Sequence, residues 1–136
     1  DILTNLHIPD LIHQHQQLQP LATLAVTNRI SSRYFLFNQQ NQLCGWRNVQ
    51  TNEEKGAVTH FTPEQKTALQ PKAFSGIQII QSAIFPKIIQ EGKFSIVDVY
   101  LHLCETHSII AFDHSDSLLI DVGKPENILK AAELFT

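Results

Sequence analysis

The 136-residue sequence contains no methionine, only two cysteines and a single tryptophan. Without methionine it has no encoded start, so we expect a fragment or a processed piece of a longer protein. The two cysteines, Cys44 and Cys104, form no CxxC pair. This usage excludes a disulfide framework as the basis of the fold and favours a reducing compartment, which for this chain predicts the cytoplasm.

Long apolar runs and basic runs are also missing. No stretch approaches the roughly 20 apolar residues that are needed to span a bilayer, and no signal peptide opens the chain. The formal net charge is −3 and no basic cluster interrupts it, so the sequence carries no electrostatic footprint for nucleic acid or an anionic membrane. The GxSxG, P-loop, HExxH and GxGxxG motifs are absent as well. We therefore expect neither a nucleic-acid partner nor a membrane.

The length, with 43% apolar and 17% charged residues, predicts one globular domain over residues 1–136. Apolar periodicity and turn signals predict strands at 1–6, 21–26, 33–37, 42–46, 72–80, 108–112 and 117–122, and helices at 8–19, from 62, at 82–90, from 95 and at 125–135. The strands at 33–37 and 42–46 form an inserted hairpin, and the polar stretch 48–56 is expected to be a loop. Strands that alternate with helices predict an α/β fold with a mixed sheet.

Gly76 lies in the middle of the strand predicted at 72–80. A glycine weakens a strand interior, so its presence there needs a reason. Either another group approaches the backbone closely at this point, or the strand carries a bulge.

The stretch S-L-L-I-D-V-G-K-P-E at 117–126 places Asp121 at the end of a buried strand and Pro125 at a helix start. Ligands of open α/β sheets bind beyond the carboxyl ends of the strands, so Asp121 is a candidate site residue. The alternative is that Asp121 only caps the following helix. Asp1 also lies at a strand end, and if the two strands are neighbours, the two carboxylates predict an oxygen-ligand site suited to Mg²⁺.

Two further groups of polar residues have simpler interpretations. His102, Cys104 and His107 are two and five residues apart on one helix, so they share no face and do not predict zinc. Trp46 at the end of the hairpin is typical of packing. Its neighbour Arg47 can offer a bidentate donor to a phosphate if the strand end faces a cleft.

Three segments, D-I-L-T-N-L at 1–6, A-F-S-G-I-Q-I-I at 73–80 and L-I-D-V-G-K-P-E-N-I-L-K-A at 119–131, together resemble the sugar-phosphate nucleotidyltransferases. These NDP-sugar pyrophosphorylase-like enzymes join an NTP to a sugar 1-phosphate and release pyrophosphate. The resemblance covers nearly the whole chain but only the C-terminal part of such an enzyme, because the family's N-terminal Gly-rich nucleotide loop has no counterpart here. It implies a Rossmann-like (GT-A-like) mixed sheet with flanking helices, the C-terminal part of that fold with an inserted hairpin.

The resemblance also assigns residues. It implies that Asp1 and Asp121 are the catalytic Mg²⁺ ligands and that Ser75 and Gly76 contact the sugar. Two departures from the family pattern are visible in the sequence: Lys124 replaces the usual threonine, and Trp46-Arg47-Asn48 replaces an E-K-P segment. Arg47 and Asn48 are therefore candidates for substrate binding, with Arg47 as a replacement cation.

The implied reaction is in-line attack of the sugar phosphate on the α-phosphorus of the NTP, with Mg²⁺ bridging the phosphates and no side-chain nucleophile. We expect an enzyme when the protein is intact, with NTP and sugar 1-phosphate as its partners, and an inactive fragment in isolation. The alternatives are a cytidylyltransferase acting on phosphocholine or another small phosphate, and a non-catalytic binding module of the same fold.

Overall fold

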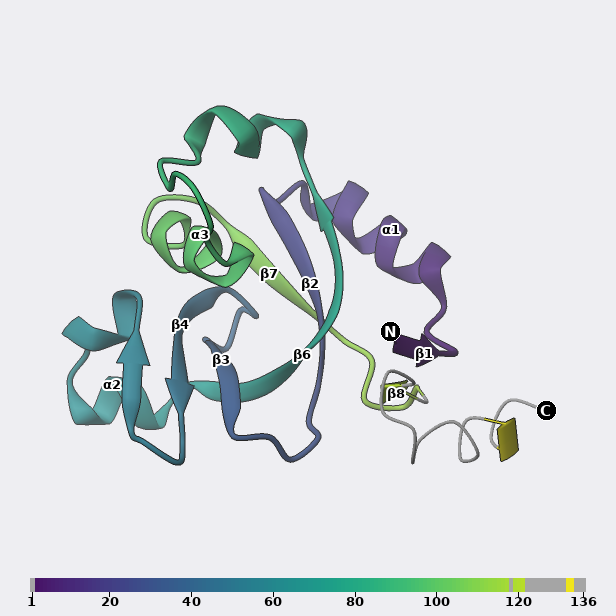
Figure 1. Cartoon of the computed structure of the whole chain (residues 1–136), viewed down its shortest axis with the longest axis horizontal. Helices are drawn as coiled ribbons and strands as arrows, with labels where there is room; N and C mark the ends of the chain where they lie inside the picture. The colour runs from purple at the N-terminus through teal and green to yellow at the C-terminus, as the bar shows by residue number, and fades with distance from the viewer. Residues whose placement is uncertain (1, 118, 122–131, 134–136) are drawn as a thin grey trace.

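The computed structural model describes residues 2–117, 119–121 and 132–133 (Figure 1). In chain order its elements are β1 (Ile2–Thr4), α1 (Ile8–Leu18), β2 (Ala22–Thr27), β3 (Arg33–Phe37), β4 (Leu43–Asn48), β5 (Glu53–Lys55), the 3₁₀ helix η1 (Ala57–His60), α2 (Pro63–Thr67), β6 (Gln70–Ile80), the 3₁₀ helix η2 (Ser82–Lys87), α3 (Ile96–Leu103), β7 (Ile109–Asp113) and β8 (Leu119–Asp121).

Six of the strands form one mixed sheet in the order β5-β4-β3-β6-β2-β7. The pair β2 and β7 is parallel, and all other neighbours in this sheet are antiparallel. All six residues of β2 are buried, as its nearly continuous apolar sequence predicts for a strand covered on both faces. The predicted α/β class with a mixed sheet and flanking helices is confirmed.

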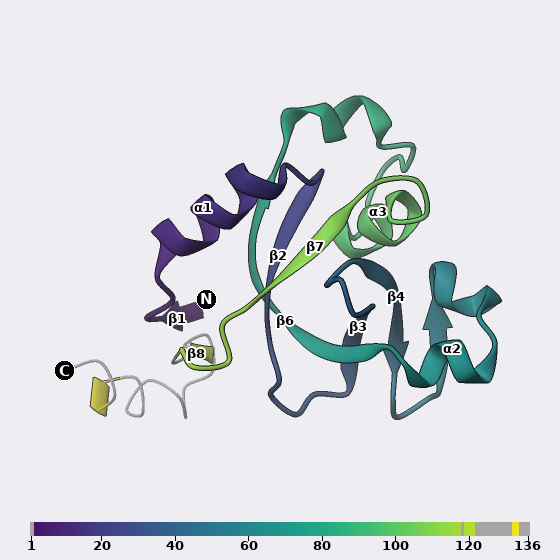
Figure 2. The ribbon, with the colours of Figure 1, turned by 180° about the vertical axis from the view of Figure 1, so that it is seen from behind.

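The two faces of the sheet are covered by different helices, α1 on one side and α3 on the other (Figures 1 and 2). Successive side chains of a strand point to opposite faces. Along β2, Leu24 and Val26 therefore join the core that contains α3, whereas Ala25 joins Leu11 of α1 in a smaller cluster. The larger core centres on Tyr100 of α3, which is fully buried.

The helices begin and end where the local sequence predicts. Helix α1 has proline in its first turn and ends at Gln19, whose left-handed φ of 48° closes the last turn. Helix α2 begins with a complete capping box between Thr62 and Gln65. Helix α3 begins at Ser95, whose hydroxyl accepts a hydrogen bond from the backbone N–H of Val97.

Two local predictions were wrong. The stretch 48–56 is not simply a loop, because β4 extends to Asn48 and pairs with β5 across a turn in which Asn52 adopts a φ of 61°. The polar sequence of β5 gives no strand signal, because β5 lies at the edge of the sheet, where a strand needs no apolar face. The segment 82–90 forms a 3₁₀ helix that ends at Lys87, because Pro86 inside it has no N–H for a longer helical ladder.

The remaining strands, β1 and β8, form a separate antiparallel two-stranded ribbon. The ribbon lies beyond the carboxyl end of β7, below the start of α1 in the view of Figure 1. Its register pairs Ile2 with Asp121 and Thr4 with Leu119. Asp1 and most of the helix predicted at 125–135 lie outside the described residues.

Candidate functional site

The carboxyl ends of the parallel strands β2 and β7 meet at one edge of the sheet, where α/β proteins commonly bind ligands. Val26 pairs with Asp113 in the last row of this ladder, and the backbone N–H of His114 donates to the carbonyl of Val26 at 2.9 Å. Strand β6 runs antiparallel to β2 and brings Ser75 and Gly76 to the same edge. Two of the predicted substrate-binding residues thus lie at the place that the fold favours for a site.

Ser75 and His114 form a buried pair at this edge. The Oγ of Ser75 lies 2.5 Å from Nε2 of His114, and the two residues are 2% and 4% exposed. Burial lowers the pKa of His114, which the nearby carboxylate of Asp113 opposes only in part. The imidazole is therefore neutral near pH 7, and its Nδ1 atom is buried without a hydrogen-bond partner among the described residues.

Gly76 lies in a bulge next to this pair. Leu24 of β2 pairs with Gln78 of β6, and Val26 pairs with Phe74, so four steps along β6 match two steps along β2. Gly76 has a φ of 80°, which favours glycine. A Cβ built on it meets nothing within 4 Å. Within the described residues the bulge therefore explains this glycine, and its outer side is open space that a ligand can occupy.

The connection that leaves β7 is anchored to this edge by polar contacts. Lys72 of β6 contacts the carboxylate of Asp113 at 2.6 Å, and the same carboxylate accepts hydrogen bonds from the N–H and hydroxyl of Ser115. Burial alone would raise the pKa of Asp113, but the hydrogen bonds from Lys72 and Ser115 outweigh it and hold the pKa below its ordinary value. Ser115 also accepts from the N–H of Asn28 after β2, at 3.0 Å.

One of the two predicted metal ligands, Asp121, belongs to the ribbon beside this edge. The backbone of Asp121 pairs with that of Ile2, and Asp1 directly precedes Ile2 in the chain but lies outside the described residues. Within the part of the chain that the structure describes, no three histidine, cysteine, aspartate or glutamate residues are grouped to hold a metal. The two-carboxylate Mg²⁺ site therefore stays a prediction.

Arg47, predicted to contact a phosphate, is engaged in an ion pair. Its Nε and one terminal nitrogen donate to the same carboxylate oxygen of Glu54, at 3.0 and 2.9 Å, and Lys66 of α2 contacts the other oxygen at 2.8 Å. Lys66 and Arg47 together hold the pKa of Glu54 below its ordinary value. This network ties α2 to the β4–β5 hairpin, so a phosphate would have to displace Glu54 from Arg47.

Asn48, predicted beside Arg47, lies on the opposite face of β4. It lines a cavity of about 340 Å³ with Trp46, Arg33 and Lys55, near the N-terminal end of α3. The ammonium of Lys55 lies 4.9 Å from the centroid of the Trp46 ring. A second cavity of about 200 Å³ shares Trp46 and Arg33 and continues to Phe74, the residue before Ser75.

Arg33 lines both of these cavities, which share Trp46 and together form one groove. Its side chain is exposed and forms no hydrogen bond or ion pair with another residue in the described ranges 2–117, 119–121 and 132–133. Its role could not be predicted from the sequence, because an arginine at the first position of a strand is an ordinary surface residue. Only the pairing of β3 with β6 brings Arg33 toward Phe74.

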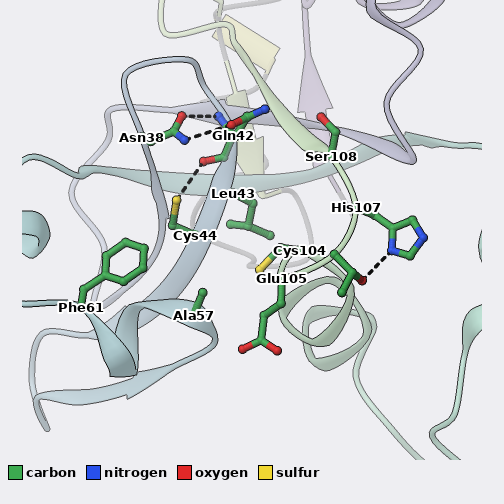
Figure 3. Close-up of a pocket in the computed structure, with 11 residues that line it drawn as sticks. Asn38, Gln42, Leu43, Cys44, Ala57, Phe61, Cys104, Glu105, His107 and Ser108 are labelled. Atoms are coloured by element: carbon green, nitrogen blue, oxygen red, sulfur yellow. Dashed lines mark hydrogen bonds between the residues drawn. The ribbon is translucent and has the colours of Figure 1, made fainter.

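A separate cavity of about 310 Å³ lies at the other end of β7 (Figure 3). It forms because the tip of the β3–β4 hairpin returns to β7, where Gln42 pairs with Ile110. Cys44 of β4 and Cys104 at the end of α3 both line it, although the sequence gave no reason to associate them. Burial raises the pKa of Cys44 and raises that of Cys104 to about 11, so both thiols are protonated and poorly reactive near pH 7.

His114 is the principal site residue that sequence reasoning missed. It lies in the loop directly after β7, and no local pattern indicates its partner, because Ser75 is 39 residues away in the sequence. The Ser75 hydroxyl is buried, and within the described residues no carboxylate bonds to Nδ1 of His114.

Comparison with known proteins finds no protein-family model and no curated protein that matches the chain. Among the described residues, no helix has the length and apolar character to cross a membrane.

Proposed function

We propose that this chain is the sugar-binding C-terminal portion of a Mg²⁺-dependent sugar-1-phosphate nucleotidyltransferase with a Rossmann-like, GT-A-like fold. The observation that carries the proposal is the register of the ribbon, in which Ile2 pairs with Asp121. This pairing brings the first and last of the three resembling segments together. The middle segment supplies the Ser75–Gly76 bulge at the neighbouring sheet edge.

Asp1 and Asp121 would hold the metal ion. Two carboxylates are the hard oxygen donors that Mg²⁺ prefers. The backbone of Asp121 pairs with that of Ile2, the residue that follows Asp1 in the sequence, in the ribbon beyond the carboxyl end of β7. When bound, Mg²⁺ would offset the charge that develops on the phosphates during in-line transfer.

The acceptor would bind along β6. The open side of Gly76 leaves room for a sugar ring close to the backbone, and the groove at Phe74 leads from there to Trp46. Arg33 supports the recognition of a phosphate in this groove, because its guanidinium is uncompensated among the described residues whereas that of Arg47 is bound to Glu54. We therefore assign the phosphate contact to Arg33 in place of Arg47, and Asn48 remains a candidate beside it.

The test measures pyrophosphate release by the chain joined to the sequence encoded upstream of Asp1, with each NTP and with glucose 1-phosphate or mannose 1-phosphate. Asp121→Asn is expected to abolish turnover, because an amide replaces a charged metal ligand. Glu64→Gln is the control, since Glu64 is an exposed carboxylate in the first turn of α2, at the opposite end of the molecule from β8 (Figure 1). Unchanged turnover in Asp121→Asn would refute the metal role.

The same assay separates the alternatives. Turnover with phosphocholine and not with sugar 1-phosphates would assign the cytidylyltransferase reaction. Absence of turnover with every acceptor, together with no binding of Mg²⁺-NTP, would leave a binding module of this fold.

A further inference from the structure

We infer that Arg29 and Arg33 form an arginine clamp that binds the phosphoryl group of the acceptor, in the cavity of about 200 Å³ that both residues line. Arg29 belongs to none of the three segments that resemble the nucleotidyltransferases. The inference rests on the proposed function, because it takes the phosphoryl group to be that of a sugar 1-phosphate.

The charge of this cavity selects an anion. Two arginines, two hydroxyl side chains and four apolar side chains line it, namely Arg29, Arg33, Ser31, Tyr34, Phe35, Trp46, Phe74 and Val97. Among the residues that the structure describes, none in this lining is acidic. The neighbouring cavity of about 340 Å³ contains Arg33 and Lys55 but also Glu53 and Asp98, so its charges balance. A phosphoryl group is therefore favoured in the smaller cavity, where no carboxylate opposes it.

The two guanidinium groups have donors to spare. Arg29 donates from one terminal nitrogen to the carbonyl of Phe74 at 3.0 Å, and its side chain makes no other hydrogen bond or ion pair within residues 2–117, 119–121 and 132–133. A guanidinium carries five N–H donors in a planar fork that matches the oxygens of a phosphate. Because Phe74 lies two residues before Gly76 on β6, its carbonyl holds Arg29 beside the place proposed for the sugar ring.

The loop between β2 and β3 presents both arginines at the edge where α/β sheets bind ligands, since it starts at the carboxyl end of β2. Its backbone is held at both ends of the loop. The N–H of Asn28 donates to the hydroxyl of Ser115 at 3.0 Å, and the N–H of Ser31 donates to the hydroxyl of Tyr34 at 2.8 Å. That Tyr34 oxygen acts as an acceptor, which leaves its own proton available to a phosphoryl oxygen.

The experiment titrates the 136-residue chain with glucose 1-phosphate, mannose 1-phosphate and inorganic phosphate, and measures the affinities by calorimetry. Arg29→Gln and Arg33→Gln are each expected to weaken the binding of all three ligands about tenfold, because each removes charge-assisted hydrogen bonds. The factor should be the same for inorganic phosphate as for the sugar 1-phosphates, since the clamp contacts phosphoryl oxygens alone. Arg29→Lys keeps the charge without the planar fork and should fall between the parent and Arg29→Gln.

Side-chain NMR separates the three arginines of the chain. The Nε–H signals of Arg29 and Arg33, each assigned by its loss in the glutamine variant, should shift when inorganic phosphate is added. The Arg47 signal is the internal control and should stay in place, because its Nε donates to Glu54 at 3.0 Å. Lys87→Gln removes a positive charge from η2, which lies at the opposite end of β2 from the loop (Figures 1 and 2), and should leave the affinity unchanged.

Parental affinity in either glutamine variant, or an Arg47 signal that shifts in place of the other two, would overturn the inference. Weakening confined to the sugar 1-phosphates would overturn it as well, because the arginines would then contact the sugar. So would failure of the parent chain to bind any of the three ligands, and pyrophosphate release would then decide the proposed function separately. Phosphate binding through both arginines, without transfer by the longer chain, would refute the enzyme and leave the clamp standing.

Discussion

At the amino end of β7 the chain encloses a cavity of about 310 Å³ lined by two thiols, whereas at the carboxyl end it buries a hydrogen-bonded serine and histidine beside an open glycine bulge. The two ends are built from the same strand and differ in their polar groups. Burial raises the pKa of Cys44 and of Cys104, which favours the protonated thiol. At the other end, Nδ1 of His114 has no hydrogen-bond partner among the described residues, and the carboxylate of Asp113 contacts Lys72 and Ser115.

This difference teaches that the size of a cavity does not indicate where the chemistry lies. The thiol cavity forms because the tip of the β3–β4 hairpin folds back onto β7. Both of its thiols already donate to backbone carbonyls, Cys44 to Gln42 and Cys104 to Leu101. The carboxyl end is the more favourable place for a ligand site, because the parallel strands β2 and β7 end at the same edge of the sheet. The bulge in β6 lies at that edge as well.

The largest effect on stability is expected near the thiol cavity. A Cβ on Gly45, the neighbour of Cys44, would lie 2.4 Å from a side-chain carbon of Val58 and 2.9 Å from the carbonyl oxygen of Lys55, so Gly45→Ala should lower the free energy of unfolding by about 3 kcal/mol. Gly76→Ala meets no atom and should cost only about 1–2 kcal/mol, from its positive φ. Urea denaturation measures both.

Gly92→Ala is the control for that pair, because Gly92 has a φ of 70° and open space but belongs to neither end of β7. It should cost as much as Gly76→Ala. A Gly45→Ala variant as stable as these two would show that the wall of the thiol cavity can move aside.

A smaller effect should distinguish the histidine end by its pH dependence. Because the pKa of His114 lies below its ordinary value of 6.5 in the folded protein, the unfolded chain binds a proton more readily. The contribution to stability is fully present above about pH 6.5 and is lost as the pH falls toward the folded pKa. His114→Gln should flatten this part of the stability curve.

His15 has a lowered pKa for the same reason, burial, so the parent curve contains both contributions. His15→Gln removes its share and isolates that of His114. If the free energy of unfolding of His15→Gln does not change between pH 7 and pH 5.5, the imidazole of His114 is not held neutral by the fold.

The smallest change is expected at the thiols, where reactivity and not stability is measured. A pKa of about 11 for Cys104, against an ordinary value of 9.0, leaves about a hundredfold less thiolate at pH 8. Alkylation by iodoacetamide, followed by mass spectrometry, should therefore modify Cys104 far more slowly in the native chain than in urea. Equal rates would show that burial does not suppress the reactivity of Cys104.

Much of the fold was predictable because its signals are local. The nearly all-apolar run of β2, the capping box at Thr62 and the proline at the start of α1 each specify a structure within a few residues. The hairpin of β4 with β5 escaped prediction because an edge strand carries polar residues. Ser75 and Gly76 were predicted from a motif, whereas Arg33 and His114 belong to no motif and are brought to these surfaces by contacts between distant segments.

The sequence by itself determined the α/β class, the positions of most elements and the residues that resemble a nucleotidyltransferase, because periodicity, caps and short motifs act over a few residues. Only the tertiary structure decided that Ser75 meets His114, that Glu54 engages Arg47 and that two distant cysteines share a cavity. Those outcomes depend on strand order and register, which arise from packing across the whole sheet and which no single stretch of the chain encodes.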